Sequence, residues 1–423
     1  MRQATFREVF AVREFRPIFG TFLLSAAGDE LARLALTVLV YARTDSPLLA
    51  ALTFAISYLP WLIGGPLLSV LADRFPRHQV LIATDAARAV LVALMALPGV
   101  PLWLLLALLF VVGMCAPPFE AARAALMADV IEGDRYAVAT SLTGITVQLA
   151  QVGGFLAGGA LLAVFSPSTA LLIDAATFLV SAVWLWTGLQ RRPAPASGPC
   201  PAGRPSLWRD AVEGLQFIGR SPRLLAIVGV AWLTTGFLYA PEGIAAPLVD
   251  EIGRGATAVG LLLAANPLGL TIGGLVIARL VPPERREDLV APLVVASLLP
   301  VLAGGLLVVL TGPGAGTFWA LVALLFLSGL AGAWTIPLNV AFVQAVPSAY
   351  RGRAFGVAAS GLAGVQGIGA LLSGLAAEGT APSAVVAVAG GLGMIAVAPA
   401  LTAYRRTRNL APVEVEAEGA PGA

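Results

Sequence analysis

A short charged stretch, SVLADRFPRH at residues 69–78, separates the second and third apolar segments of the chain. Almost everything around it is apolar: 58% of the 423 residues are hydrophobic and only 12% are charged. The mean hydropathy is +0.88. A water-soluble globule of this composition lacks the polar residues needed to cover its surface. The sequence therefore predicts an integral membrane protein whose segments are joined by charged loops.

Twelve apolar segments have the length of a bilayer crossing, about 20 residues. They lie near residues 17–42, 47–72, 79–97, 102–126, 137–165, 168–189, 223–247, 256–281, 288–310, 316–346, 350–377 and 382–404. The first is longer than the apolar core of a signal peptide, so we expect it to remain as a helix. We predict an all-α membrane protein with twelve transmembrane helices.

The basic residues are all arginine, and they alternate between the two sides of the predicted membrane. The N-terminus, the even-numbered loops and the C-terminus are rich in arginine, whereas only Arg43 and Arg254 fall on the other side. Because positive residues concentrate in cytoplasmic loops, both termini are predicted to be cytoplasmic. We expect a multi-pass protein of the cytoplasmic, or inner, membrane.

The chain also repeats itself at an offset of 216 residues. Ala107–Phe110 aligns with Ala323–Phe326, and Gly153–Gly158 aligns with Gly369–Gly374. This predicts two parallel six-helix bundles. The expected domains are an N-terminal bundle at 1–190, a cytoplasmic linker at 191–222, a C-terminal bundle at 223–404 and a cytoplasmic tail at 405–423. Within the linker, apolar residues at helical spacing predict an amphipathic helix over 206–220.

Several stretches resemble a known family. Residues 69–78 resemble signature A of the major facilitator superfamily, G-x-x-x-D-R-x-G-R-K/R, with Ser69 and Pro76 in place of its glycines. The glycine motif Gly153, Gly154 and Gly158 resembles its signature C, which is associated with drug/proton antiporters. Ile173–Leu179, Glu213–Ile218 and Val346–Gly356 are similar to the branch that contains the macrolide exporters and the enterobactin exporter. The resemblance implies the superfamily fold and transport by alternating access.

The resemblance also implies a cytoplasmic gate. In the family, the signature-A aspartate faces the start of helix 11, which would bring Asp73 near Arg351 and Arg353 and near the positive end of that helix dipole. Arg74 and Arg77 would be its local partners. Alternatively, these arginines only follow the positive-inside rule, although that rule does not require the acidic Asp73.

Three ionisable residues in the first helix are the leading candidates for proton coupling. Asp29 lies twelve residues after Pro17, which places it about 18 Å along the helix, close to mid-membrane. Glu30 and Arg33 follow, and one cation can neutralise only one of two acids. Burial and like-charge repulsion disfavour the charged form of the remaining carboxyl, so we expect it to exchange a proton near neutral pH. The alternative is a purely structural ion-pair cluster.

Each of the other polar residues in the predicted helices has two alternative roles. Asp85 and Arg88, one turn apart in helix 3, form either a structural pair or a gate. Glu120 and Arg123 either join the Asp73 network or form a solvated surface pair. Asp174 either attracts cationic cargo or makes a helix contact. The remaining candidates for a substrate cavity, or for contacts between helices, are Gln148, Gln151, Asn266, Asn339 and Trp232.

Glycines on helices 5 and 11 predict that these two helices form the sliding contact between the bundles. The single histidine argues against a His-based triad or metal site, and no phosphate-cradling GxxxxGK[ST] motif is present. We therefore expect no enzyme, no cofactor and no nucleic-acid partner. The predicted function is export of small amphipathic or lipophilic molecules, of drug or siderophore type, by proton antiport. Uptake, lipid flipping and a non-pumping membrane sensor remain as alternatives.

Overall fold

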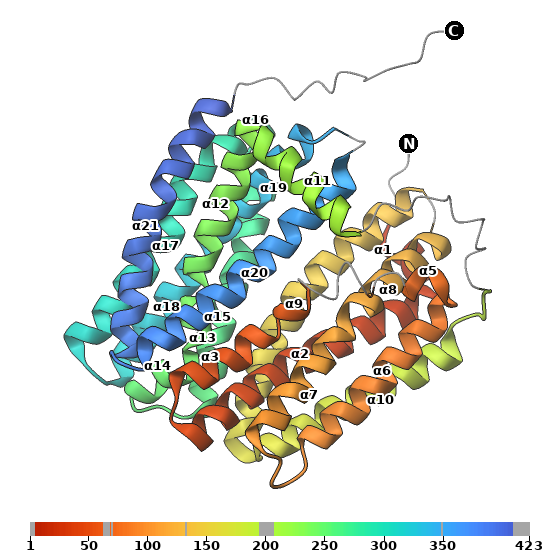
Figure 1. The fold of residues 1–423 in the computed structure, drawn as a ribbon, viewed down its shortest axis with the longest axis horizontal. Helices are drawn as coiled ribbons and strands as arrows, with labels where there is room; N and C mark the ends of the chain where they lie inside the picture. Colours follow the sequence, from red (N-terminus) through yellow and green to blue (C-terminus); the bar gives the residue numbers. More distant parts are fainter. Residues whose placement is uncertain are drawn as a thin grey trace.

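The computed structural model describes residues 5–61, 68, 71–131, 133–193, 207–347 and 350–408, and these residues form helices and no strand. The helices of the N-terminal bundle are α1 (Phe6–Phe10), α2 (Phe15–Thr44), α3 (Pro47–Ile56), α5 (Leu71–Arg74), α6 (Arg77–Met95), α7 (Leu102–Met114), α8 (Ala116–Val130), α9 (Asp134–Val164) and α10 (Pro167–Gly188). Figure 1 shows them in red to yellow.

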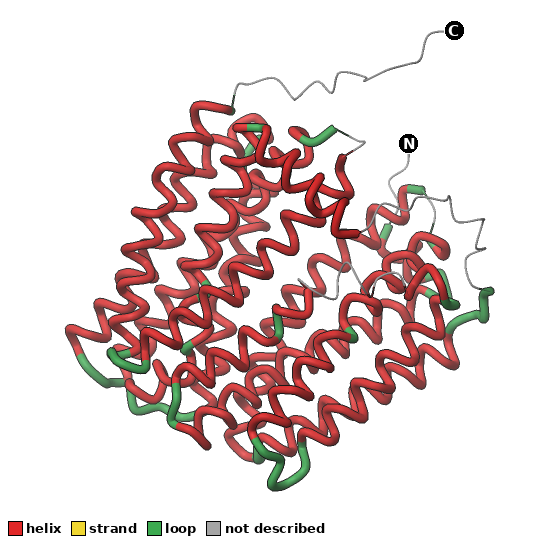
Figure 2. The backbone as a smooth tube through the Cα atoms, viewed as in Figure 1, coloured by secondary structure: helices red, strands yellow, loops and turns green. Residues whose placement is uncertain are grey.

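The helices of the C-terminal bundle follow α11 (Leu207–Arg220). They are α12 (Pro222–Leu238), α13 (Ala240–Gly243), α14 (Ala245–Glu251), α15 (Ala256–Leu280), α16 (Pro283–Arg286), η1 (Glu287–Leu289), α17 (Val290–Thr311), α18 (Ala315–Ala331), η2 (Gly332–Trp334), α19 (Thr335–Ala345), α20 (Arg351–Ala377) and α21 (Pro382–Thr407). In Figure 2 the helices run as long red tubes joined by short green loops.

The observed helices agree with the twelve crossings expected from the sequence. Within the described residues, ten segments are long and apolar enough to span a membrane, and Pro47–Trp61 is a shorter apolar helix. The twelfth is α2, which has 30 residues, about 45 Å at the rise of an α-helix, and carries Asp29, Glu30 and Arg33 in its middle. The prediction of an all-α membrane protein with two six-helix bundles is confirmed.

Local sequence explains where several helices begin. Ser46, Ser166 and Ser221 each precede a proline, and each serine hydroxyl accepts a hydrogen bond from the backbone N–H three residues later. Proline fits the first helical position because it lacks the N–H that would have no partner there. These Ser-Pro pairs start α3, α10 and α12.

The bundles meet along two pairs of helices. α9 packs against α15, and α3 packs against α20. A shared apolar core joins them, in which Leu34 and Phe155 of the N-terminal bundle contact a cluster containing Ile244, Leu248 and Leu262 of the C-terminal bundle. We call the end with α1, α11 and the last turn of α21 the terminal end, and the opposite end the distal end. In Figure 1 the bundles lean together at the distal end and diverge toward the terminal end.

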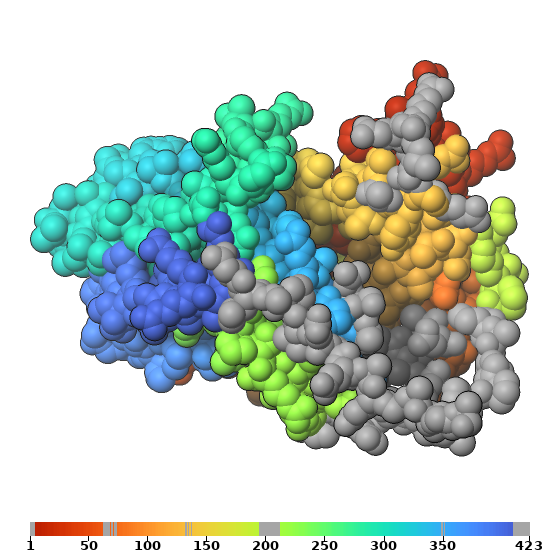
Figure 3. Space-filling model, turned by 90° about the horizontal axis from the view of Figure 1, so that it is seen from above, coloured from red at the N-terminus to blue at the C-terminus, as the bar shows by residue number. Residues whose placement is uncertain are grey.

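The predicted amphipathic helix is present as α11 and is fixed to the C-terminal bundle. The rings of Phe217 and Tyr350 stack with centroids 4.6 Å apart, and Arg353 pairs with Glu213 at 3.1 Å. Figure 3 views the terminal end, with the C-terminal bundle in green to blue beside the N-terminal bundle in red to yellow. Residues 194–206 of the predicted cytoplasmic linker lie outside the described residues.

Candidate functional site

The three charged residues of α2 are arranged as an ion pair with one acid left over. Arg33 Nη1 donates to Glu30 Oε2 at 2.8 Å, and their side chains are 16% and 14% exposed. Asp29 makes no hydrogen bond or ion pair with any described residue. One arginine is thus committed to the acid three residues before it, and the Asp29 carboxyl stays uncompensated by its own helix.

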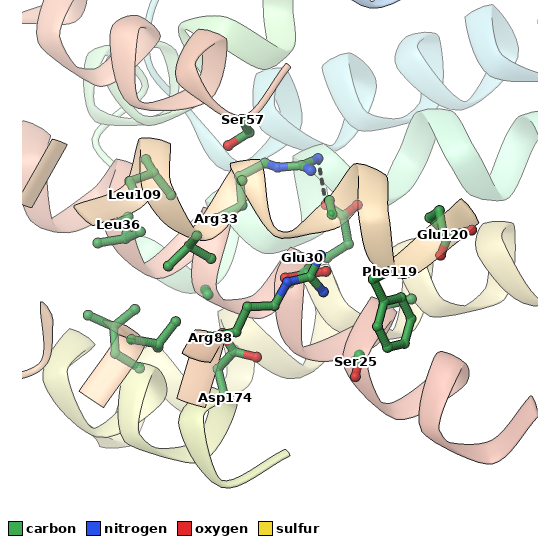
Figure 4. Close-up of a pocket in the computed structure, with 18 of the residues that line it drawn as sticks. Ser25, Glu30, Arg33, Leu36, Ser57, Arg88, Leu109, Phe119, Glu120 and Asp174 are labelled. Atoms are coloured by element: carbon green, nitrogen blue, oxygen red, sulfur yellow. Dashed lines mark hydrogen bonds and ion pairs between the residues drawn. The ribbon is translucent and has the colours of Figure 1, made fainter. Parts of the chain in front are cut away.

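Asp29, Glu30 and Arg33 line a cavity of about 330 Å³ inside the N-terminal bundle. Its walls come from α2, from Ser57 and Trp61 just after α3, and from α6, α7, α8, α9 and α10. Most of the lining is apolar or aromatic, including Phe22, Trp61, Met95, Leu109, Val112, Phe119 and Leu171. Figure 4 shows the dashed Arg33–Glu30 contact, with Arg88, Asp174, Ser25 and Phe119 around the same space.

A second charged pair connects α6 to α10. Asp85 is fully buried and its Oδ1 lies 4.0 Å from Nη1 of Arg88, while its Oδ2 accepts a hydrogen bond from the Ser181 hydroxyl. The Arg88 guanidinium lies 5.3 Å from the ring centres of both Phe119 and Phe178. Cation–π contacts of this kind favour a positive charge in an otherwise apolar site. Arg88 therefore both pairs with Asp85 and faces the cavity.

Glu120 and Arg123 of α8 face the same cavity. Arg123 Nη2 donates to Glu120 Oε2 at 2.5 Å, and its guanidinium sits 3.9 Å from the centre of the Phe22 ring. Arg123 is only 7% exposed. Of the two alternatives for this pair, the solvated surface pair does not hold for Arg123, because α8 turns this face toward α2. The contact with the Asp73 network stays a prediction.

Asp174 of α10 is the fourth cavity acid and is 1% exposed. Its Oδ1 accepts a hydrogen bond from the Thr177 hydroxyl at 3.3 Å. A Cβ atom on Gly28 would lie only 2.2 Å from that same oxygen. The glycine thus lets the Asp174 carboxyl approach the backbone of α2 next to Asp29.

The other predicted cavity residues lie elsewhere. Gln148, Gln151, Asn266, Asn339 and Trp232 are absent from the wall of this cavity. Asn339 is exposed. Trp232 donates to the Ala358 carbonyl at 3.1 Å and fills the space over Gly361, so it packs α12 against α20. Of the six cavity candidates, Asp174 alone lines the cavity; helical periodicity identifies a face but not which helix that face meets.

A series of side-chain contacts connects Arg33 to the C-terminal bundle. Its guanidinium lies 5.5 Å from the ring centre of Phe54 and 5.3 Å from that of Tyr58, and the Tyr58 ring is perpendicular to that of Tyr239 at 6.0 Å. Beyond Tyr239, Glu242 is 9% exposed and its Oε2 has no hydrogen-bond partner among the described residues. The charged cluster thus reaches the boundary between the bundles.

A family model described as "Major Facilitator Superfamily" matches residues 18–287 of the chain. The chain belongs to the major facilitator superfamily. Among curated proteins of this superfamily, an uncharacterized MFS-type transporter, YfiS of Bacillus subtilis (strain 168), is 28% identical over 350 residues, 82% of each chain. Macrolide efflux protein A of Streptococcus pyogenes is 21% identical over 372 residues, 86% of this chain and 89% of that one.

Solved structures with similar folds are also superfamily transporters. The peptide transporter POT, in complex with sulfate, superposes with a TM-score of 0.72 at 16% identity and covers 98% of both chains. A bacterial homolog of the human lysosomal transporter Spinster, inward-facing and occupied, gives a TM-score of 0.69 at 15% identity over 92% of this chain and 96% of that one. At these identities the likeness shows a common fold. The family model and the curated relatives, in contrast, show that the chain is a membrane transporter of the superfamily type.

The superfamily gate residues are only partly visible. The side chains of Asp73 and Arg351 lie outside the described residues, so the predicted contact between them stays a prediction. Arg74 is exposed at the last position of α5. Arg77 pairs with Asp129 of α8, within its own bundle, and Arg353 pairs with Glu213 of α11. Arg77 is thus paired within the N-terminal bundle, and Arg353 is paired with the helix that packs on the C-terminal bundle.

The superfamily glycine motif positions α9 against α2. A Cβ atom on Gly154 would lie 2.6 Å from the Ala27 carbonyl and 2.7 Å from Glu30 Cβ, and one on Gly158 would touch Leu34 at 3.0 Å. Gly153, in contrast, has open space on its side. The motif therefore sets how closely α9 approaches the charged turn of α2.

Helices 5 and 11 lie at the bundle boundary as predicted, but neither is the other's partner. α9 meets α15 where a Cβ atom on Gly159 would lie 3.0 Å from Gly260 Cα. α20 meets α3 where one on Gly374 would lie 2.3 Å from Ala51 Cβ. The sequence identifies the two helices at the boundary, while only the structure shows that each packs against a different helix. Sliding along these contacts stays a prediction.

Polar contacts reinforce the boundary at the distal end. Glu378, just after α20, accepts hydrogen bonds from the Ser46 hydroxyl and, at 3.0 Å, from the Leu48 backbone N–H. The Tyr41 hydroxyl donates to Asp250 Oδ2 at 3.2 Å. The hydrogen bond from Ser46, followed by that from Leu48, holds the pKa of Glu378 below its usual range. Sequence analysis missed Glu378; a lone acid in a loop gives no signal that it faces the start of another helix.

Proposed function

We propose that this chain exports small amphipathic or lipophilic molecules, of drug or siderophore type, in exchange for protons. It would do so in the cytoplasmic membrane, with both termini in the cytoplasm. The membership in the superfamily and the similarity to a macrolide efflux protein support this choice of function. The proposal places the chain in the branch of the macrolide and enterobactin exporters.

The observation that carries the proposal is the uncompensated carboxyl of Asp29 beside the Glu30–Arg33 pair. An ionised carboxylate with no cation of its own is costly in the low-dielectric part of a membrane protein. Proton binding removes that cost. Asp29 would therefore bind a proton when the cavity opens to one side of the membrane and release it when the cavity opens to the other. Asp29 would carry the proton, while Arg33 stays paired with Glu30 beside it.

The arrangement of the bundles supports alternating access. At the distal end α3 and α20 are in contact and Glu378 caps the start of α3. With cytoplasmic termini, this is a state closed to the outside. Opening to the outside would separate these contacts and bring the terminal ends together, where Asp73 would meet Arg351 and Arg353, with Arg74 and Arg77 beside it.

The chemistry of the cavity supports the cargo class. Phe22, Trp61 and Phe119 present flat apolar surfaces next to charged groups. Such walls suit a molecule with a lipophilic body and a few polar groups. The cargo would thus resemble a dye, an antibiotic or a lipophilic siderophore rather than a sugar or an amino acid.

Transport in proteoliposomes tests the proposal. With a pH gradient imposed, the wild-type protein should accumulate ethidium or radiolabelled erythromycin against its gradient. Asp29→Asn should lose at least about tenfold in this uphill transport yet retain exchange of labelled for unlabelled cargo, since only the driving step is removed. Asp45→Asn is the matched control in the same helix: Asp45 ends α2 with a φ of 50°, a conformation that asparagine tolerates.

The outcomes separate the alternatives. Full uphill transport in Asp29→Asn combined with Glu30→Gln would remove this site from the mechanism. Saturable binding without any exchange in the wild-type protein would indicate a membrane sensor. Accumulation only in the opposite direction would indicate uptake.

A further inference from the structure

We propose that Asp174 of α10 completes the proton site, with its carboxyl and that of Asp29 sharing a proton across the contact between α2 and α10. This inference rests on the proposed function, because it names the second residue of the same site. It assigns a defined chemical role to a helix-6 acid that the sequence leaves between a cargo contact and a structural one.

The first step is the close approach of the two helices. Gly28 precedes Asp29 directly, and the space that a side chain at residue 28 would fill is occupied by Asp174 Oδ1 and Thr177 Oγ1, at 2.2 and 2.7 Å from an ideal Cβ position. The Asp174 carboxyl is therefore pressed onto the turn of α2 that carries Asp29. Both carboxyls line the same cavity, and the charge of Asp29 acts on Asp174. One proton shared between them would relieve this like-charge repulsion.

The second step is that every cavity arginine already has an acid. Arg33 pairs with Glu30, and Arg123 pairs with Glu120. These pairs account for two of the four acids that line the cavity and for two of its three arginines.

The third arginine, Arg88, lies between several acids. It is 4.0 Å from Asp85, and its charge also acts on Asp29 and Asp174. One guanidinium cannot neutralise three carboxylates. At least one positive charge has to be supplied to the pair from outside the protein, and a proton is the smallest that fits between two carboxyl groups.

An unpartnered hydroxyl marks the place as a binding site. Ser25 is 3% exposed, lines the cavity, and its Oγ has no hydrogen-bond partner among the described residues. It lies four residues before Asp29, on the same face of α2. Buried hydroxyls are normally satisfied. Ser25 would donate to the ionised member of the pair or hold a water that delivers the proton.

The groups that face this pair define how it works. They come from α2 (Glu30 and Arg33), α6 (Asp85 and Arg88) and α8 (Glu120). Arg88 is the charged residue that would change partner, because its ion pair with Asp85 is long and the Ser181 hydroxyl already donates to the other Asp85 oxygen. A shift of Arg88 toward Asp29 and Asp174 would expel the proton, and a shift back to Asp85 would favour its return.

Infrared difference spectroscopy of the purified full-length protein tests the shared proton directly. A pH step should reveal carboxylic acid bands in the wild type. If the proton is shared, Asp174→Asn must move the titration midpoint of the Asp29 band by about one pH unit or more, and Asp29→Asn must do the same to the Asp174 band. Asp45→Asn should leave both bands unchanged. Independent titration of the two bands would overturn the proposal.

A second variant guards against misfolding of Asp174→Asn. Thr177→Val keeps the side-chain shape and removes the hydroxyl that donates to Asp174, so it should move the Asp29 midpoint by a smaller amount. An unchanged Asp29 band in Thr177→Val and Asp174→Asn alike would contradict the pair. Failure of the proposed function looks different: the bands would be coupled as described, but no pH gradient would drive transport in the wild type.

Discussion

The two bundles share one sequence repeat, yet three buried charged residues of the N-terminal bundle have apolar residues at the matching positions of the C-terminal one. At the offset of 216 residues, Asp85, Arg88 and Asp174 correspond to Val301, Gly304 and Gly390. Val301 is 1% exposed, and a Cβ atom on Gly390 would lie 2.3 Å from the backbone of Leu302. At these positions the C-terminal bundle is apolar and closely packed, whereas the N-terminal bundle has charged side chains at its cavity.

The six-helix fold therefore does not determine whether the interior of a bundle is charged or apolar. The same six-helix arrangement supports either a polar cavity or an apolar core, depending on three or four side chains. Given this difference in charge, we expect the N-terminal bundle to bind the proton and the cargo and the C-terminal bundle to act as a rigid partner.

The largest expected effect comes from making the N-terminal bundle resemble the C-terminal one at a single position. Asp85→Val leaves Arg88 buried without its partner, which should cost about 3–5 kcal/mol of stability. Thermal unfolding in detergent micelles would measure the loss. The double variant Asp85→Val with Arg88→Met should recover most of it. A single variant as stable as the wild type would show that Asp85 does not compensate Arg88.

An intermediate effect is expected at the glycine motif, where two adjacent residues provide a matched pair. Gly154→Ala forces a methyl group against Ala27 and Glu30, so it should destabilise the protein by about 1–3 kcal/mol and slow transport. Gly153→Ala meets open space and should be neutral or stabilising by up to about 1 kcal/mol, because alanine favours a helix over glycine. Equal effects of the two substitutions would mean that the contact between α9 and α2 is not tight.

The smallest effect is expected at the distal end. The contacts from Ser46 and Leu48 favour the charged form of Glu378 and lower its pKa, so this contact is present at neutral pH. It should be lost only as the pH falls through that lowered pKa. Glu378→Gln should therefore weaken the contact between the bundles at pH 7.

Spin labels on exposed residues would detect that weakening. Val164 and Leu310 are 77% and 80% exposed at the distal ends of α9 and α17, so cysteines there can be labelled after the native cysteines are replaced. The distance between them should shift toward longer values in Glu378→Gln at pH 7, and in the wild type only in acid. A distance distribution that does not respond to either change would exclude Glu378 as a link between the bundles.

Much of the fold could be predicted from the sequence, because each crossing is a local property of composition and length. That Arg33 pairs with only one of the two acids near it was also predictable, since residues three and four apart lie on one side of a helix. What the sequence could not provide was the partner of each helix face. The sequence left open whether Glu120 lies in a charged network or in a surface pair, and nothing in the repeat shows that α9 meets α15 or that Gly28 makes room for Asp174.

The attachment of α11 to the C-terminal bundle has a practical consequence. Gly214 of this helix lies against the backbone of Arg353, and Phe217 stacks on Tyr350. Because it is bound to one bundle by ring stacking and an ion pair, α11 should travel with that bundle as the transporter cycles. An antibody fragment raised against α11 would thus serve as a fiducial that marks the position of the C-terminal bundle in electron micrographs.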